Sequence, residues 1–182
     1  MTAPVDVRSA PYSRRNPRFN RETIKRFLSS CGITYVFMGD LLGARYSGTA
    51  LFFEGTRMVD FSKVRATGSF KRGIDRLCDG IAGGHRIALM CAEKDPFDCH
   101  RFVLVSPALA QRGIEVTHIL ADGSLVPNAV LEDRLLEKYS IRYHQKPLFE
   151  TPRTREQALA VAYERRNRDI GYVHEEGPAL DT

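Results

Sequence analysis

Two cysteines, a histidine and several charged residues crowd one short segment, Met90-Cys91-Ala92-Glu93-Lys94-Asp95-Pro96-Phe97-Asp98-Cys99-His100-Arg101. The apolar run before it, Ile87 to Met90, predicts a strand buried on both faces of a parallel sheet. Asp95-Pro96 predicts the start of a helix, because aspartate caps a helix and proline suits its first position. Ligands bind at the carboxyl ends of strands in open α/β sheets, so we expect a site here, with Cys91 at the strand end.

This segment could carry out thiol chemistry. Cys99 is predicted about one turn into the helix and close to Cys91, where the helix N-terminus, His100 and Arg101 favour a thiolate. The candidate catalytic residues are Cys91 as nucleophile or acid/base, His100 as its proton partner, and Glu93 and Cys99 beside them. The alternative is that both cysteines are small buried apolar residues.

Spacing tests two familiar cysteine chemistries. A phosphatase-like loop needs an arginine soon after the cysteine, and the first arginine after Cys91 is Arg101, which disfavours that interpretation. A closed zinc site takes four ligands, commonly as two close pairs. Cys91, Cys99 and His100 supply three, with Glu93 or a distant histidine as a fourth. Spacing gives a metal no support, but a metal stays open as an alternative; no residue is assigned as a metal ligand, and the cofactor is unknown.

A second polar segment follows a short predicted strand at Val5 to Val7. Its arginines offer planar forks for phosphate or carboxylate, and its aromatic residues could stack on bases. Up to Arg26 the chain has seven basic and two acidic residues, and the remainder has twenty of each, so the excess of +5 lies here. The candidate substrate-binding residues are Asp6, Arg8, Ser9, Arg14, Arg15, Phe19 and Asn20, with Arg101 from the cysteine segment.

Alternatives stay open for this loop. Arg14, Arg15 and Arg18 could belong to a solvated loop or pair with carboxylates elsewhere in the fold. Asp6, at a strand end, could orient an arginine just as well as take part in chemistry. Spacing decides neither role.

Together these motifs resemble a known family. They are Asp6-Val7-Arg8-Ser9, Pro11, Ser13-Arg14-Arg15, Pro17, Phe19-Asn20, Leu42-Gly43, Met90-Cys91-Ala92-Glu93, Cys99-His100-Arg101, His118-Ile119 and Asp122-Gly123. In this order they closely resemble the domain of unknown function 488 family, from about Val5 to Gly123. The resemblance implies a compact Rossmann-like α/β domain with both polar segments at one end of the sheet, and it implies no reaction.

One departure from the family concerns the amino end. Members usually begin with an additional strand, ending in a Gly-His-Ser-like motif, and a helix. Here Met1-Thr2-Ala3-Pro4 leads straight into the Asp-Val-Arg strand, so either the start was assigned too late or the chain is a truncated member. If a histidine of that strand belongs to the site, the site is incomplete. A missing inner strand would also expose a sheet edge that invites pairing with another chain.

The surrounding elements are predicted from periodicity and caps, and they give the fold class α/β, a Rossmann-like three-layer sandwich with a mostly parallel sheet. The predicted elements are a helix capped by Asn20 that buries Ile24, Phe27, Leu28 and Cys31 and ends at Gly32; a strand from Ile33 to Met38; a loop from Gly39 to Gly55 pinned by Phe52 and Phe53; two helices after Val59, the second burying Phe70, Ile74, Leu77 and Ile81; a helix from Asp98 to Arg112 disturbed at Pro107; and a strand from Glu115 to Leu120 in which His118 is a packing residue.

The predicted domains are a core of residues 1–127 and a C-terminal helical extension of residues 128–182. Asn128 is expected to cap a helix through Tyr139, and Thr154 with Gln157 resembles a capping box that opens a helix to about Arg168. The arginines at the end of that helix suit its dipole without needing any ligand.

Composition excludes several classes. A chain of 182 residues with 43% hydrophobic content can bury one ordinary core. No apolar stretch approaches the roughly 20 residues that span a bilayer, and the start lacks the apolar core of a signal peptide. The four cysteines show no disulfide-type spacing, so we expect reduced thiols and a cytoplasmic protein without a membrane partner.

Three functions are consistent with the sequence. We favour an enzyme acting on a nucleotide or another phosphorylated or anionic substrate, with a Cys/His/Arg site at the strand ends. The alternative is a nucleic-acid-binding module that uses the arginine-rich loop, with structural cysteines. The third is a structural or partner-binding protein, such as a homodimer paired through a sheet edge.

Overall fold

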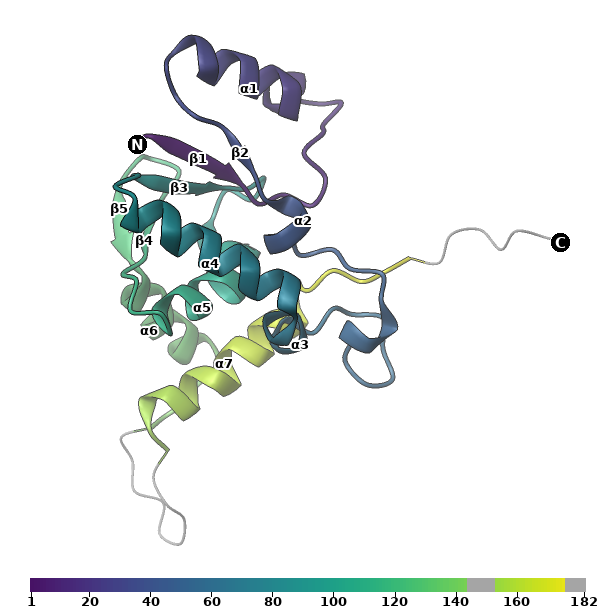
Figure 1. The fold of residues 1–182 in the computed structure, drawn as a ribbon. Helices are drawn as coiled ribbons and strands as arrows, with labels where there is room; N and C mark the ends of the chain where they lie inside the picture. The colour runs from purple at the N-terminus through teal and green to yellow at the C-terminus, as the bar shows by residue number, and fades with distance from the viewer. Residues whose placement is uncertain (144–152, 176–182) are drawn as a thin grey trace, which may run out of the picture.

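A computed structural model describes residues 1–143 and 153–175 and shows a mixed α/β fold (Figure 1). Its main sheet has the order β2-β1-β3, and both pairs of neighbours are parallel. β1 (Ala3–Asp6) lies in the centre, between β2 (Val36–Phe37) and β3 (Ile87–Met90). β4 (Thr117–Ile119) and β5 (Leu125–Pro127) form a separate antiparallel pair. The predicted parallel sheet is therefore confirmed, but the strand predicted from Glu115 does not join it.

Helices lie on both sides of this sheet. In Figure 1, α1 (Arg21–Ser30) is on one side and α4 (Gly68–Ala82) on the other. The remaining α-helices are α2 (Gly39–Leu42), α3 (Phe61–Ala66), α5 (Ser106–Ala110), α6 (Asn128–Lys138) and α7 (Arg155–Ile170). In the part of the chain that is described, no helix is long and apolar enough to cross a membrane. The mixed α/β class is confirmed, and the finer Rossmann-like sandwich stays a prediction.

The stripe of α4 forms the centre of the core. Phe70, Ile74 and Leu77 are buried as predicted, whereas Ile81 at the end of the helix is 36% exposed. Thr67 caps this helix by accepting a hydrogen bond from the amide of Phe70. Gly73 lets α2 approach closely, because a Cβ at this position would lie 2.7 Å from Leu42 Cδ2. These contacts fix the elements beneath the sheet.

Two burial predictions are wrong at α1. Ile24 and Leu28 are buried, but Phe27 is 65% exposed and Cys31 is exposed. The sheet beside α1 is narrow, because β2 contains only two residues, and it covers a narrow stripe of the helix. Cys31 is already the C-terminal capping residue, and the predicted stop at Gly32 is confirmed by its φ of +69°.

The strands are shorter and less buried than predicted. The strand predicted from Ile33 to Met38 contracts to Val36–Phe37. All four residues of β3 are half-buried rather than buried on both faces, because β3 lies at the edge of the sheet. The pairing of this edge with a second chain stays a prediction. The segment from Gly39 to Gly55, predicted as an irregular loop, instead begins with α2 and contains a 3₁₀ turn, Thr49–Leu51. Phe52 and Phe53 are buried, as predicted for residues that pin this segment.

The helix after the cysteine segment begins later than predicted. Asp95 does cap a turn, but this is a short 3₁₀ helix, Pro96–Asp98. Cys99 then has extended backbone, and its carbonyl accepts from the next helical turn, so Cys99 starts that helix rather than lying one turn inside it. A π-helical turn, Arg101–Val105, precedes α5. The disturbance predicted at Pro107 is confirmed.

Pro107 also explains a contact from α3. Proline has no N–H, so the carbonyl four residues earlier, that of Val103, loses its usual helical partner. Arg65 Nη1 donates to this carbonyl over 3.1 Å instead. A side chain from α3 therefore satisfies the backbone group that the proline leaves free.

The two C-terminal helices are confirmed and pack into the same hydrophobic core as the sheet. Leu135, Ala158 and Ala162 are 0% exposed. Thr154 and Gln157 form the predicted capping box, whereas Asn128 is the first residue of α6 and makes no cap with its side chain. The division into two domains at residue 127 stays a prediction.

His118 has the packing role that its position in the sequence predicts. It is 6% exposed, and Phe102 meets its ring edge to face. The Nε2–H of His118 donates a hydrogen bond to Asn128 Oδ1 over 3.0 Å. Burial lowers the pKa of this imidazole.

Candidate functional site

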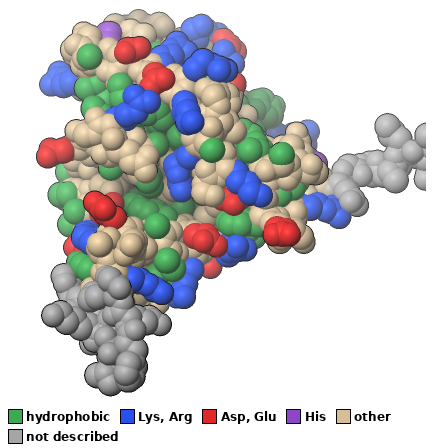
Figure 2. All heavy atoms as spheres, turned by 60° about the horizontal axis from the view of Figure 1, so that its bottom comes forward, with side chains coloured by type: hydrophobic (Ala, Val, Ile, Leu, Met, Phe, Trp, Pro, Cys, Tyr) green, Lys and Arg blue, Asp and Glu red, His purple; other side chains and the backbone are tan. Residues whose placement is uncertain are grey.

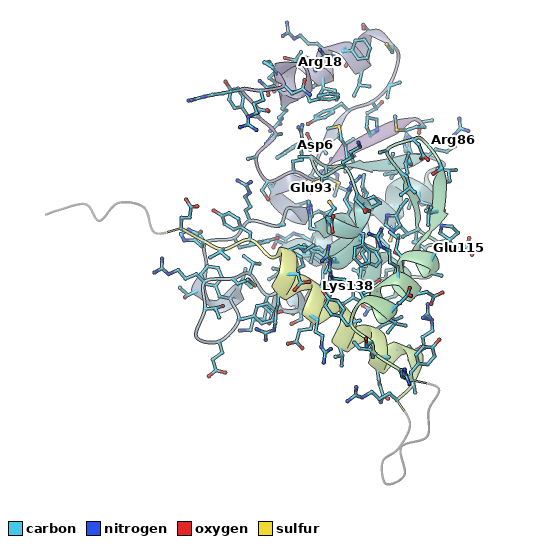
Figure 3. All side chains as sticks on the ribbon, turned by 180° about the vertical axis from the view of Figure 1, so that it is seen from behind. Asp6, Arg18, Arg86, Glu93, Glu115 and Lys138 are labelled. Atoms are coloured by element: carbon cyan, nitrogen blue, oxygen red, sulfur yellow. The ribbon has the colours of Figure 1, made fainter. Side chains whose placement is uncertain are left out.

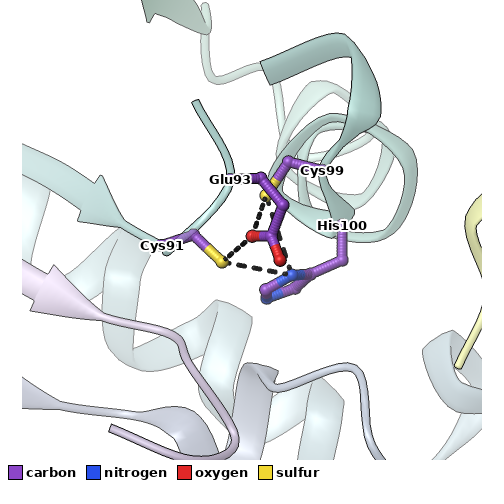
Figure 4. A group of neighbouring side chains, drawn as sticks. All are labelled: Cys91, Glu93, Cys99 and His100. Carbon is purple, nitrogen blue, oxygen red and sulfur yellow. Dashed lines mark hydrogen bonds between the residues drawn. The ribbon is translucent and has the colours of Figure 1, made fainter. Parts of the chain in front are cut away.

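The four predicted catalytic side chains meet at the carboxyl end of β3 (Figure 4). Cys91 Sγ lies 2.5 Å from Glu93 Oε2 and 3.6 Å from His100 Nδ1. Cys99 Sγ lies 3.3 Å and 3.8 Å from the same two atoms. All four ligand atoms lie within 4.8 Å of one another. The structure thus brings these residues together; we call them the cysteine cluster.

The end of β1 fixes the orientation of the histidine. The amide of Val7 donates to Met90 O over 3.1 Å, which joins the ends of β1 and β3. His100 Nε2 lies 3.1 Å from the carbonyl oxygen of Val7. A carbonyl only accepts, so Nε2 carries a proton, and Nδ1 faces the two sulfurs.

The two cysteines shift each other's pKa in opposite directions. A hydrogen bond from Cys91 lowers the pKa of Cys99 to about 3 against the effect of burial, and His100 and Arg101 act in the same direction. The same contact with Cys99, together with burial and Glu93, raises the pKa of Cys91. These directions favour the thiolate at Cys99, which is 1% exposed, over one at the half-exposed Cys91.

Arg101 directs its donors into the cysteine cluster. Its backbone N–H and its Nε donate to Cys99 Sγ over 3.4 and 3.2 Å. Its Nη2 donates to the carbonyl oxygen of Glu93 over 2.8 Å. The side chain expected to bind a substrate anion thus supports the thiolate and the turn beside it.

Two arginines of the C-terminal helices hold the turn between the cysteines. Arg134 pairs with Asp95 over 3.2 Å. Arg166, only 6% exposed, pairs with Asp98 and donates to Phe97 O over 3.2 Å. These contacts lie within the chain, so the prediction that the arginines at the end of α7 need no ligand stays a prediction. Sequence reasoning missed both contacts, because nothing local marks partners so distant along the chain.

Asp6 and Arg8 form a buried ion pair. Asp6 is 0% exposed and accepts from Arg8 Nε over 2.8 Å, from Arg8 Nη2 over 2.6 Å and from the hydroxyl of Tyr35 over 2.6 Å. Arg8 Nη2 also donates to the carbonyl oxygen of Phe19 over 2.8 Å. Asp6 therefore orients an arginine, one of the two roles that the sequence leaves open, and Arg8 ties the loop that follows β1 back to its own end.

The rest of that loop divides into a fixed base and an exposed tip. Ser9 Oγ accepts from the amides of residues 44 and 45, and Asn20 Oδ1 accepts from the amide of Ser13. Arg14 and Arg15 are exposed, and Phe19 is 44% exposed. Seen from behind, Arg18 lies beside α1, away from Glu93 (Figure 3). Of the predicted binding residues, Asp6, Arg8, Ser9 and Asn20 thus build the loop, and Arg14, Arg15 and Phe19 face outward.

Two open clefts border this part of the molecule. One of about 690 Å³ lies beside the cysteine cluster and is lined by Glu93, Lys94, Asp95, Pro96, Asp98, Leu120, Ala121, Asp122, Leu131 and Arg134. The other, of about 470 Å³, is lined by Ser9, Phe37, Gly39, Asp40, Arg45, Tyr46, Ser47 and Gly48. The second cleft contains the residues that follow β1 and β2, so it opens at the same ends of the strands as Cys91.

Comparison with known proteins gives one match. The model of the family described as domain of unknown function DUF488 matches residues 1–107. This range contains the arginine loop and the whole cysteine cluster, and it covers more than half of the 182 residues. No curated protein and no solved structure matches the chain.

Proposed function

The chain belongs to the DUF488 family, whose description states no reaction, and from the geometry of the site we propose that it is an enzyme acting on a nucleotide or another phosphorylated or anionic small molecule. Its reactive centre is the cysteine cluster. The observation that carries this proposal is the convergence of two thiols, a carboxylate and an imidazole within 4.8 Å at a strand end. Strand ends of parallel sheets are where ligands bind.

The cysteine cluster is a poor device for stability alone. The carboxylate of Glu93 lies beside two sulfurs, and even a protonated thiol is a weak hydrogen-bond donor. By contrast, the buried carboxylate of Asp6 meets two nitrogens of an arginine, the strong arrangement for such a group. Grouping ionisable side chains without such pairing costs folding free energy, and this cost is typical of functional sites.

Binding and chemistry are divided between the two segments in this proposal. Arg14 and Arg15, at the exposed tip of the loop, hold the anionic group. The cleft beside Ser9 and Arg45 receives the rest of the substrate. Because Asp6 and Arg8 bind each other, their task is to position the loop.

A ligand screen with matched variants tests the proposal. We would measure the thermal shift of the full chain with nucleoside phosphates, sugar phosphates and inorganic phosphate, and then the affinity of each hit by calorimetry. We expect Arg14→Ala and Arg15→Ala to weaken binding, and Cys91→Ala to abolish turnover of a ligand that still binds. Arg18→Ala is the control, because Arg18 is an exposed arginine of the same loop that lies beside α1. Unchanged ligand binding in Arg15→Ala together with unchanged turnover in Cys91→Ala would contradict the enzyme.

A nucleic-acid-binding module is the second candidate, and the exposed aromatic residues of the loop favour it. Tyr12 is 68% exposed and Phe19 is 44% exposed, with Arg14 and Arg15 exposed between them. Such a surface could stack on bases and neutralise phosphates. The face shown in Figure 2 carries basic side chains interspersed with acidic ones rather than one basic patch.

Salt dependence distinguishes this candidate from the enzyme. Each phosphate contact on a single strand should contribute about −0.7 to the slope of log affinity against log salt. We would measure the anisotropy of a labelled single-stranded oligonucleotide across a salt series. Nucleic-acid binding predicts a shallower slope for Arg14→Ala and no effect of Cys91→Ala. An affinity that ignores ionic strength would count against it.

A further inference from the structure

We propose that Cys91, Cys99 and His100 hold a zinc ion at the carboxyl end of β3, with Glu93 as a fourth, exchangeable ligand. The inference rests on the proposed function in taking the cysteine cluster as the reactive centre, and it deepens that function by naming the species bound there. In this assignment the two sulfurs are ligands rather than nucleophiles.

The distances between the ligand atoms fit a tetrahedral zinc site. With zinc–sulfur distances of about 2.3 Å and zinc–nitrogen or zinc–oxygen distances of about 2.0–2.2 Å, neighbouring ligand atoms lie about 3.3–3.8 Å apart. His100 Nδ1 lies 3.6 Å from Cys91 Sγ and 3.8 Å from Cys99 Sγ. Glu93 Oε2 lies 3.3 Å from Cys99 Sγ. These three of the six edges of the tetrahedron therefore already match, and all four ligand atoms lie within 4.8 Å of one another.

The fourth separation involves the side chain with the most freedom. Glu93 Oε2 lies 2.5 Å from Cys91 Sγ, closer than two ligands of one zinc ion. To coordinate the metal, this oxygen must withdraw by about 1 Å from the sulfur. Glu93 is exposed, so its carboxylate can move while the three inner ligands stay in place.

The surroundings of the ligands also suit a metal. The Nε2–H of His100 donates to the carbonyl oxygen of Val7, which is the usual partner for the second nitrogen of a metal-bound histidine and leaves Nδ1 free to coordinate. Arg101 donates to Cys99 Sγ from its backbone N–H and from Nε. Hydrogen bonds of this kind stabilise a thiolate without using the lone pair that binds the metal.

Charge balance points the same way. Two thiolates and one carboxylate carry three negative charges, and the doubly charged zinc ion together with the guanidinium of Arg101 neutralises them. Thiolate, imidazole and carboxylate together are typical ligands of zinc, whereas magnesium and calcium prefer oxygen alone. The chemistry of the donor set therefore selects zinc among the common divalent ions.

The exposure of the ligands indicates an open rather than a closed site. Cys99 and His100 are buried, Cys91 is half-buried and Glu93 faces solvent beside the cleft of about 690 Å³. Catalytic zinc sites keep three protein ligands and leave one position for water or substrate. An anionic oxygen of the substrate would take the position of Glu93, where the metal would polarise it as a Lewis acid.

Metal content and cobalt spectroscopy test this inference without any substrate. The reduced full-length protein should bind one zinc ion per chain, measured by mass spectrometry of the metal and by competition with a coloured chelator. Cobalt in the same site should give the visible absorption of tetrahedral coordination and the charge-transfer band of thiolate ligands. We expect Cys91→Ser to remove both signals, and Arg101→Leu to weaken zinc binding by roughly 10- to 100-fold, as for other residues that support a metal ligand.

Control variants separate a metal site from a folding effect. Cys31→Ser, at an exposed cysteine outside the cysteine cluster, should bind zinc like the unmodified chain. Glu93→Gln should retain thiolate-to-cobalt charge transfer while its visible bands shift. Reduced protein that binds neither zinc nor cobalt would overturn the inference, as would equal binding by Cys91→Ser. A protein without a zinc site could still give hits in the ligand screen, and a protein without ligand hits could still bind zinc. The two sets of measurements therefore test the zinc site and the proposed enzyme independently.

Discussion

The buried ion pair between Asp6 and Arg8 should be among the most sensitive points of the fold. Asp6→Asn keeps the size of the side chain and removes its charge, which leaves the guanidinium of Arg8, 9% exposed, without a counter-charge. Removing one partner of a buried pair costs about 3–5 kcal/mol. In a chain of this size we therefore expect the melting temperature to fall by roughly 6–20 °C.

A double-mutant cycle isolates the pair from its surroundings. Arg8→Met should also be costly, because it leaves the carboxylate buried with Tyr35 as its remaining side-chain donor. In the double variant neither charge remains, so its loss should be smaller than the sum of the two single losses by about 3 kcal/mol. The free energies of unfolding would be measured by urea titration followed by circular dichroism.

A matched surface pair provides the control. Arg112 and Asp75 also approach to 2.6 Å, but both side chains are 50% exposed. Asp75→Asn should therefore cost no more than about 1 kcal/mol. If Asp6→Asn cost as little as this control, or if the cycle were additive, Asp6 and Arg8 would not act as a structural pair. They would then return to the list of substrate-binding candidates.

Three further predictions concern packing and protonation. Burial lowers the pKa of His118, so on acidification the unfolded chain binds this proton at a higher pH than the folded chain does. The free energy of unfolding should therefore fall as the pH drops below about 6.5, and His118→Gln should flatten this fall when urea denaturation is repeated across pH. An unchanged pH dependence in the variant would contradict this reasoning. Asn167→Leu leaves the amide of Phe61 and the carbonyl of Val59 unpaired and should cost about 2–6 kcal/mol of unfolding free energy; a loss below about 1 kcal/mol would mean that water replaces these bonds. Gly73→Ala gains about 1 kcal/mol of helix propensity but forces a Cβ to 2.7 Å from a Leu42 carbon, so the melting temperature should fall rather than rise.

Local signals in the sequence were sufficient for the long helices. The stripe of α4 repeats at helical spacing, and α7 opens with a capping box contained in four consecutive residues. The lengths and burial of strands depend on what lies beside them, which periodicity does not reveal. β3 reads as a buried strand from its apolar residues, yet its place at the edge of the sheet leaves it half-buried.

The cysteine cluster could be predicted because its four residues lie within ten positions of one strand–turn–helix unit. The groups that orient them could not be predicted, since they come from distant segments. The carbonyl of Val7 sets the tautomer of His100, and Arg134 and Arg166 hold the turn between the two cysteines. Periodicity and local motifs do not reveal contacts between segments that are distant in the sequence.

In the arginine-rich loop after β1, the sequence alone likewise cannot distinguish arginines with different roles. Arg8 and Arg15 are chemically identical and seven residues apart, and spacing assigns both to anion binding. Only the strand before the loop separates them, because β1 ends at Asp6 and Arg8 reaches back to that carboxylate. Val7 lies between Asp6 and Arg8, and its carbonyl oxygen accepts a hydrogen bond from His100. The ion pair that shapes the loop is therefore next in the chain to the carbonyl that orients His100, so the end of β1 connects the base of this loop to the cysteine cluster.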